Sequence, residues 1–264
     1  MEENVFSSFT QPLTKSGNSS LVYPPPWIYS VDYIASHVYF KMESLEDLVP
    51  YPLEVVDGEG WIYIADFLSV SGNRWDLLYE QPQMTQYKEG AIVIKVKFNG
   101  NTYTYFPFMW VDKDWSLMRG LIMGYPKKLA EISLSKFNSL FKEYDGPREG
   151  ITYGGYVSRN GNLIIKLKVT LEEKSDSIPI SKFGPVVGFR RFPVAGEGTE
   201  VYELVQVIKS DSRYEDIWKG KAEIAINGSL NDELNLLKIE KVINGYYYRS
   251  YFKNTGTKVL YRIK

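Results

Sequence analysis

The sequence predicts a mainly β (α+β) fold in which many antiparallel strands close or stack around a core. Three observations support this class. A chain of 264 residues with 44% hydrophobic content can bury a substantial core. Aromatic residues make up 15% of it, and they favour strands and pocket walls over helical bundles. Two Asn-Gly pairs, at 99–100 and 160–161, each separate strand-like segments, which is the usual sequence of a tight hairpin.

The domain organisation follows from where the strand-like pattern begins. Residues 1–30 contain few periodic segments and end in Pro24-Pro25-Pro26-Trp27, so we expect an extended N-terminal arm. Residues 31–264 hold no linker rich in Ser or Gly and no run of one charge sign. They are therefore expected to form a single domain.

The strand-like segments follow one another along most of the chain. The early ones are YIASHVYFKM, WIYIADFLSV, AIVIKVKFNGNTYTYFPFMWV and TYGGYVSRNGNLIIKLKVTL. The later ones are FGPVVGFRRFP, VYELVQVIKS, KAEIAI and YYYRSYF. Each combines β-branched and aromatic residues with alternation, so each is predicted to be a strand.

Helical signals are few. WSLMRGLIM after Asp114 fits a helix of about three turns, which Gly124 ends. SLEDLVP predicts a short helix before Pro50, and LNDELNLL predicts a short acidic helix or a turn. The segment YPKKLAEISLSKF that follows Gly124 is expected to be extended.

Composition excludes several classes of function. The chain has 31 basic and 32 acidic residues, which argues against nucleic-acid binding as its main role. It has no cysteine, and its one histidine, His37, is interpreted as a hydrogen-bonded core or surface residue. No nucleotide or metal motif is present, so no cofactor and no metal are expected. The start lacks a secretory signal and no segment is apolar enough to span a membrane, so we expect a soluble, cytoplasmic protein.

One pentad, Gly124-Tyr125-Pro126-Lys127-Lys128, carries a chemical signal. Adjacent side chains on an extended segment face opposite ways, so one lysine can enter the interior while the other meets solvent. Burial would lower the pKa of the inner amine, and a neutral amine is a nucleophile for carbonyl groups. An exposed Lys-Lys pair fits these residues as well.

The segment MGYPKKLAEI resembles the catalytic segment of the acetoacetate decarboxylase family. Further similarity extends over QPLT, LVPYPLEV, YKEGAIVIKVKFNG, RRFP, VYELV, WKGKAEI and NDELNLLKIEKVINGYY. The resemblance implies a closed antiparallel β-barrel with a few short helices. It also implies a cofactor-independent carbon–carbon lyase that decarboxylates a β-keto acid to a ketone and CO2 through a lysine imine.

The resemblance also implies roles for particular residues. Lys127 matches the Schiff-base lysine, Lys128 its electrostatic neighbour, and Glu89 of YKEG the family's active-site glutamate. Tyr125, beside the lysines, is expected in the pocket wall. Tyr63 or Asp66 lies nearest to a second acid of the family pocket.

The family's substrate-side arginine is not matched. The alignment places Asp32 or a neighbour there, and residues 1–73 contain no arginine. Arg190 and Arg191 are candidate replacements, because arginine binds carboxylates through two hydrogen bonds and only one of two adjacent residues can face inward. Surface salt bridges would equally account for them.

Three functions remain open on these grounds. The first is decarboxylation of a β-keto acid. The second is another Schiff-base reaction, an aldol addition or dehydration on a 2-keto acid, which needs the same lysine. The third is a non-catalytic barrel that binds a small ligand. The expected partners are a small keto acid and further copies of the chain, which residues 1–30 could wrap, with no nucleic acid and no membrane.

Overall fold

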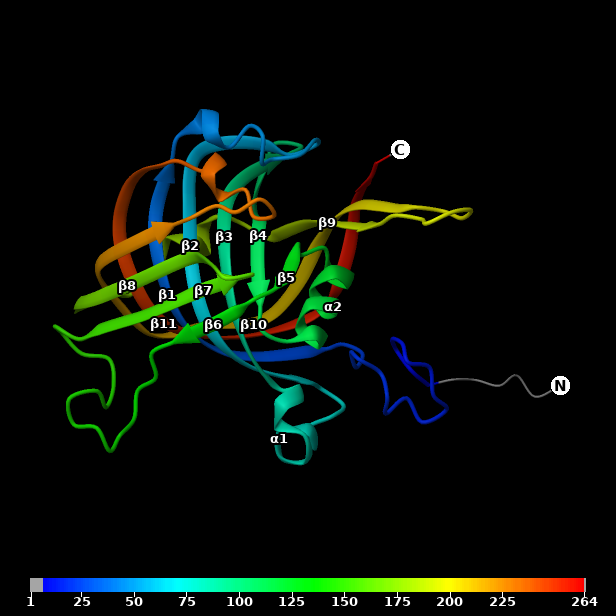
Figure 1. Ribbon diagram of the computed structural model, residues 1–264, viewed down its shortest axis with the longest axis horizontal. Helices are drawn as coiled ribbons and strands as arrows, with labels where there is room; N and C mark the ends of the chain where they lie inside the picture. Colours follow the sequence, from blue (N-terminus) through cyan, green and yellow to red (C-terminus); the bar gives the residue numbers. More distant parts are fainter. Residues whose placement is uncertain (1–6, 264) are drawn as a thin grey trace.

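The computed structural model describes residues 7–263, which form one eleven-stranded sheet with a few short helices (Figure 1). Strand pairing leads from β11 through β1, β2, β3, β4, β9 and β10. Because β10 also pairs with β11, the pairing returns to its start and produces a ring of strands. The sheet continues from β10 through β8 and β7 to β6, and β5 pairs with β4.

The bounds of the elements are as follows. The strands are β1 (Trp27–Phe40), β2 (Glu54–Ser71), β3 (Gln86–Phe98), β4 (Asn101–Val111), β5 (Lys127–Leu129), β6 (Glu131–Leu134), β7 (Thr152–Arg159), β8 (Asn162–Lys174), β9 (Val186–Phe192), β10 (Val201–Ile226) and β11 (Ile239–Arg262). The α-helices are α1 (Leu77–Glu80) and α2 (Asp114–Met123), and single 3-10 turns lie at Met42–Ser44, Pro82–Met84, Pro179–Lys182 and Leu234–Leu236.

Both predicted hairpins are confirmed. β3 and β4 meet at Asn99 and Gly100, whose φ angles are 46° and 81°. β7 and β8 meet at Asn160 and Gly161, with φ angles of 51° and 77°. Two successive left-handed residues match the right-handed twist of the flanking strands, which is why Asn-Gly selects this turn.

Three structural predictions need correction. The mainly β class is confirmed, but the pairing is not wholly antiparallel, because β4 runs parallel to both β5 and β9. The helix predicted in SLEDLVP, residues 44–50, is not formed: a 3-10 turn, Met42–Ser44, ends at its first residue, and turns follow. VYELVQVIKS and KAEIAI belong to one bent strand, β10, of 26 residues.

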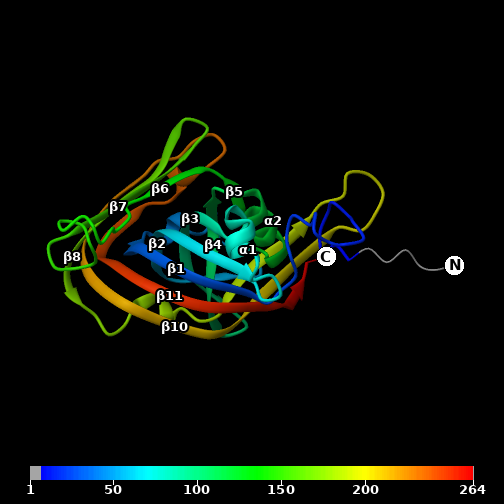
Figure 2. The same cartoon turned by 90° about the horizontal axis from the view of Figure 1, so that it is seen from below.

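The strands β1, β2 and β3 are buried on both faces. One face packs inside the ring, where Trp61, Tyr63 and Tyr87 belong to one apolar cluster. The other face, with Ile62 and Ile64, packs in a second cluster beneath β7 and β8, which fold over it (Figure 2). Two-sided burial explains the long apolar runs in these strands and keeps the inner cluster dry.

The N-terminal arm packs against its own domain. Residues 1–6 lie outside the described part, and residues 7–26 contain no helix or strand. The ring of Phe9 packs on Trp27, and the indole nitrogen of Trp27 donates to the carbonyl of Tyr23. Wrapping around a neighbouring subunit stays a prediction. In residues 7–263 no helix is both long and apolar enough to cross a membrane.

Candidate active site

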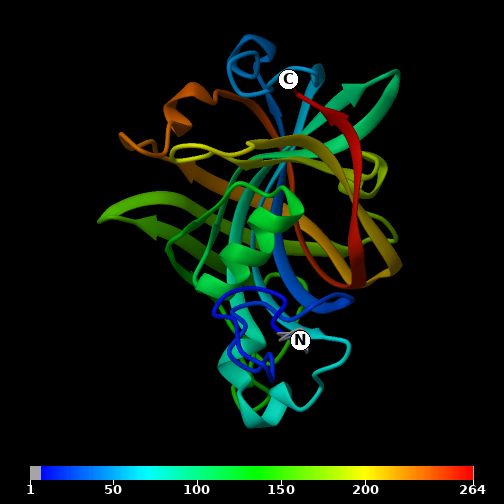
Figure 3. The same cartoon turned by 90° about the vertical axis from the view of Figure 1, so that its right-hand side faces the viewer.

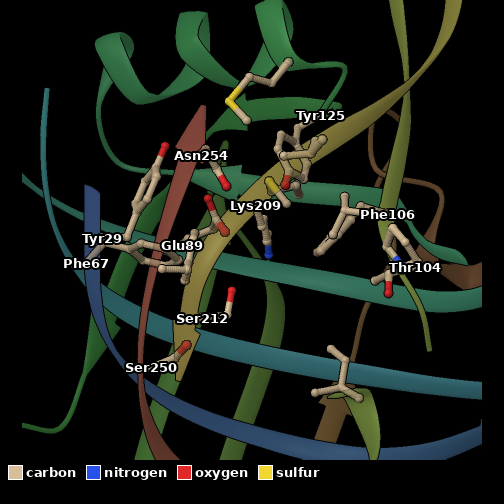
Figure 4. Close-up of a pocket in the computed structure, with 18 of the residues that line it drawn as sticks. Tyr29, Phe67, Glu89, Thr104, Phe106, Tyr125, Lys209, Ser212, Ser250 and Asn254 are labelled. Atoms are coloured by element: carbon tan, nitrogen blue, oxygen red, sulfur yellow. The ribbon is translucent and has the colours of Figure 1, made fainter. Parts of the chain in front are cut away.

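A cavity of about 380 Å³ lies within the ring and is lined in part by residues of α2 (Figure 4). Figure 3 shows the green helix α2 in front of the strands. Its wall is largely aromatic, and the rings come from Tyr29, Tyr33, Tyr63, Phe67, Tyr87, Phe106, Tyr125, Tyr214, Tyr248 and Phe252. Four charged residues line it: Glu89, Arg119, Lys127 and Lys209. An apolar cavity with a few converging polar groups is the usual form of a small-molecule site.

Lys127 and Glu89 form a buried ion pair in this cavity. Their Nζ and Oε2 atoms are 2.8 Å apart, and only 7% and 5% of the two side chains are exposed. Nζ also donates to the hydroxyl of Ser116 at 3.1 Å. The amine is therefore held in one position by two partners from different elements.

Local structure explains how Lys127 reaches the cavity. Gly124 ends α2 with a φ of 87°, and its amide hydrogen bonds to carbonyls in the last turn of the helix. The chain then runs along β4 as β5, with Lys127 opposite Met109. Gly120 leaves room for the lysine, since a Cβ there would lie 2.3 Å from Cδ of Lys127.

Glu89 is positioned by β3 rather than by a loop. It lies opposite Ala65 of β2, so it shares the inner face of the sheet with Tyr63. The hydroxyl of Tyr63 donates to Oε1 of Glu89 at 2.6 Å. This hydrogen bond holds the carboxyl group of Glu89 in an orientation in which its other oxygen, Oε2, meets Lys127.

Burial lowers the pKa of Lys127, and the charge of Arg119 lowers it further. The negative charge of Glu89 and its hydrogen bond act in the opposite direction. The rings of Tyr87 and Tyr125 lie 5.1 Å and 5.9 Å from Nζ. The net result is an amine that loses its proton more readily than an ordinary lysine.

The structure places Lys128 outside the cavity. Its ammonium donates to Asp232 at 3.1 Å and to the carbonyl of Asn231. Asp232 also accepts bonds from Trp110 and Arg159, so Lys128 belongs to a separate polar cluster. The expectation that only one lysine of the pair faces inward is therefore confirmed. The neighbouring cation that acts on Lys127 is Arg119 and not Lys128.

The predicted arginines also lie elsewhere. Arg190 is bound to Glu203 through two guanidinium nitrogens, and Arg191 pairs with Glu200 at 3.1 Å. Neither borders the cavity described above. Glu203 of the neighbouring strand β10 and Glu200, just before that strand, hold the two guanidinium groups, so we do not retain them in the site.

Asp66 is corrected in the same way. It lies three positions after Tyr63 on β2, and the alternation of a strand puts the two on opposite faces. Asp66 pairs in register with Asp32 of β1. Desolvation raises the pKa of both carboxyl groups, but neither lines the cavity.

His37 has a structural role, because its ring nitrogen Nε2 is hydrogen bonded to Glu59 at 3.0 Å.

Sequence reasoning missed two cations. Arg119 is the only charged residue inside the apolar part of α2, which is a weak signal that it faces something polar. In the structure its Nη1 donates to Ser69 at 2.7 Å, while its buried Nε has no partner. Lys209 lies in VIKSDS, and nothing local distinguishes it from a surface lysine.

Residues 10–263 match the model of the acetoacetate decarboxylase family. The chain belongs to this family. No curated protein matches the sequence significantly. Within residues 7–263, no three His, Cys, Asp or Glu side chains are grouped so that they could hold a metal ion.

Solved structures agree with this assignment. An acetoacetate decarboxylase-like enzyme from Sphingomonas wittichii RW1 is 29% identical, covers 97% of this chain and 100% of its own, and superposes with a TM-score of 0.90. The enduracididine biosynthesis enzyme MppR, solved with the condensation product of pyruvate and imidazole 4-carboxaldehyde, is 24% identical over 97% of both chains, with a TM-score of 0.88. An acetoacetate decarboxylase structure is 17% identical over 99% of this chain and 98% of its own, with a TM-score of 0.79. The chain is therefore an acetoacetate decarboxylase-like enzyme with a mainly β fold.

Proposed function

We propose that this enzyme forms an imine between Lys127 and a small keto acid and uses the resulting enamine as its reactive intermediate. The observation that carries the proposal is the buried amine of Lys127, 2.8 Å from the carboxylate of Glu89. Burial lowers the pKa of that amine, which favours its neutral, nucleophilic form. The aromatic wall supports the proposal because it excludes the water that would hydrolyse an imine.

The mechanism follows from these positions. Glu89 first accepts a proton from the ammonium of Lys127, and the freed lone pair of Nζ attacks the keto carbon. Glu89 returns this proton to the keto oxygen, then accepts a second proton from the nitrogen and passes it to the resulting hydroxyl, which leaves as water. The protonated imine then carries the positive charge formerly on the lysine. Loss of a proton or of CO2 next to the imine carbon then gives a neutral enamine, because the iminium accepts the electron pair. The hydrogen bond from the Tyr63 hydroxyl orients Glu89 for these transfers.

Two fates of the intermediate correspond to two reactions. Arg119 lines the cavity with a buried Nε that has no partner, and we assign it to the substrate carboxylate. A carboxylate bound to a fixed cation is stabilised against loss as CO2. We therefore favour proton loss from a 2-keto acid, followed by aldol addition and dehydration. MppR, whose structures contain pyruvate and a pyruvate condensation product, supports this choice.

Decarboxylation of a β-keto acid to a ketone and CO2 is the second candidate. It is supported by the family to which the chain belongs and by the apolar wall of the cavity. Carbon–carbon lyase activity would then end with protonation of the enamine and hydrolysis of the imine. No cofactor takes part in either scheme.

One panel of assays separates these reactions. We expect borohydride to trap pyruvate on the enzyme, and we expect pyruvate with an aromatic aldehyde to give a condensation product without CO2. CO2 release from acetoacetate, without condensation of pyruvate, would replace the first reaction with the second. No covalent adduct with any keto acid would contradict the imine itself and leave a ligand-binding role.

A further inference from the structure

The charged residues of the cavity do not balance. Arg119, Lys127 and Lys209 face one acid, Glu89, in the lining. Glu89 is paired with Lys127, and it remains the counter-charge when Lys127 becomes a protonated imine. Arg119 and Lys209 are then two cations that no acidic side chain in the described lining neutralises. A ligand that neutralises both must carry two negative charges.

Lys209 is an exposed residue that also lines the cavity. Desolvation lowers the pKa of Lys209 to about 8, while the charge of Glu89 opposes this. The Nζ atom of Lys209 lies 4.5 Å from the centroid of the Phe252 ring.

Polar groups that could complete an anion site surround Lys209. Ser212 of β10 and Ser250 of β11 line the same part of the cavity, where Figure 4 shows the amine of Lys209 directed inward. Asn254 lies opposite Lys209 in the pairing of β10 with β11. Asn254 is 3% exposed, and the Nδ2 group of its amide can donate to an anion.

We infer that Lys209, with Ser212, Ser250 and Asn254, binds a second carboxylate of the substrate, so that the enzyme acts on a keto diacid. This rests on the proposed function, in which Arg119 binds the carboxylate next to the keto group. Arg119 of α2, Lys209 of β10 and Lys127 of β5 all line this one cavity, although they come from separate elements. Burying the second carboxylate without a cation would be costly, which makes Lys209 decisive for specificity.

The test compares 2-oxopentanedioate with 2-oxopentanoate, which have the same chain length and differ in the terminal carboxylate. The concentration that half-saturates borohydride trapping should be at least about tenfold lower for the diacid, as expected for a hydrogen bond to a charged group. Lys209→Met should remove this preference, so that the diacid and the monoacid half-saturate trapping at similar concentrations. Lys209→Arg keeps the charge and should keep the preference.

Lys253→Met is the matched control. Lys253 lies on the neighbouring strand β11, pairs with Asp211 at 2.6 Å and is absent from the cavity lining. This variant should retain the preference for the diacid. If Lys209→Met fails to fold, Lys209→Gln provides the same comparison with a polar side chain.

A second measurement separates this inference from the imine. Pentanedioate, which has no keto group, should raise the melting temperature more than pentanoate does, and Lys209→Met should abolish the difference. If pentanedioate gives the larger shift in melting temperature but no keto acid is trapped, the proposed function is contradicted and the diacid inference is not. Equal trapping of both keto acids, unaffected by Lys209→Met, would overturn the diacid inference alone. An adduct mapped to Lys209 would also overturn it, because Lys209 would then be a nucleophile.

Discussion

The substitution Gly120→Ala should separate the position of Lys127 from the stability of the fold. A Cβ at residue 120 would lie 2.3 Å from Cδ and 2.7 Å from Cε of Lys127. Ordinary contacts at such positions begin near 3.4 Å, so the lysine side chain has to move by about 1 Å. A displacement of that size between reacting groups costs roughly 100-fold in rate. The distance of 2.8 Å between Nζ and Glu89 cannot survive it unchanged.

Stability should respond differently. Alanine is favoured over glycine inside a helix by about 1 kcal/mol, and the atoms it meets belong to a flexible side chain. We therefore expect the melting temperature to stay within a few degrees while borohydride trapping slows by roughly 100-fold. Gly146→Ala is the control, because nothing lies within 4 Å of a Cβ at that position. Trapping at the wild-type rate in Gly120→Ala would refute the position assigned to Lys127.

Three further predictions follow from the site. Glu89→Gln should fold normally, because the amide keeps the size of the side chain and the hydrogen bond from Tyr63. The rate of imine formation should fall by about 100-fold or more in single-turnover trapping. Unchanged kinetics would remove Glu89 from the mechanism. The rate of borohydride trapping should increase with pH as Lys127 loses its proton. It should reach a plateau below pH 10.5, the ordinary pKa of lysine, because burial lowers the pKa of Lys127. A rate that still increases at pH 10.5 would contradict the lowered pKa. Lys128→Ala should keep trapping activity. Asp232→Ala should destabilise the fold by about 3 kcal/mol in denaturant unfolding, because Trp110, Lys128 and Arg159 lose a shared buried acceptor. Loss of trapping in Lys128→Ala, with a stable Asp232→Ala variant, would place Lys128 in the site.

Local signals in the sequence predicted the local structure well. The Asn99-Gly100 and Asn160-Gly161 turns, and the end of α2 at Gly124, depend on the φ angles of single residues. The separation of Lys127 from Lys128 depends only on the alternation of an extended segment. The same alternation places Asp66 on the opposite face from Tyr63, so that assignment was avoidable.

Non-local pairing determined what the sequence could not show. Arg190 pairs with Glu203 of β10 and Arg191 with Glu200, just before β10. The register of β10 with β9, which brings these acids beside the arginines, cannot be read from composition. Lys209 borders the cavity because β10 changes its register with β11 there, at a shift between Ile208 and Lys209. Such shifts depend on packing across the ring rather than on a sequence motif.

The most direct test of the imine is to map its position. Wild-type enzyme is incubated with pyruvate and borohydride, digested, and the modified peptide is sequenced by mass spectrometry. We expect one adduct on Lys127, none in Lys127→Ala, and an unchanged yield in Lys128→Ala. An adduct on Lys128, or a yield that survives Lys127→Ala, would contradict the account.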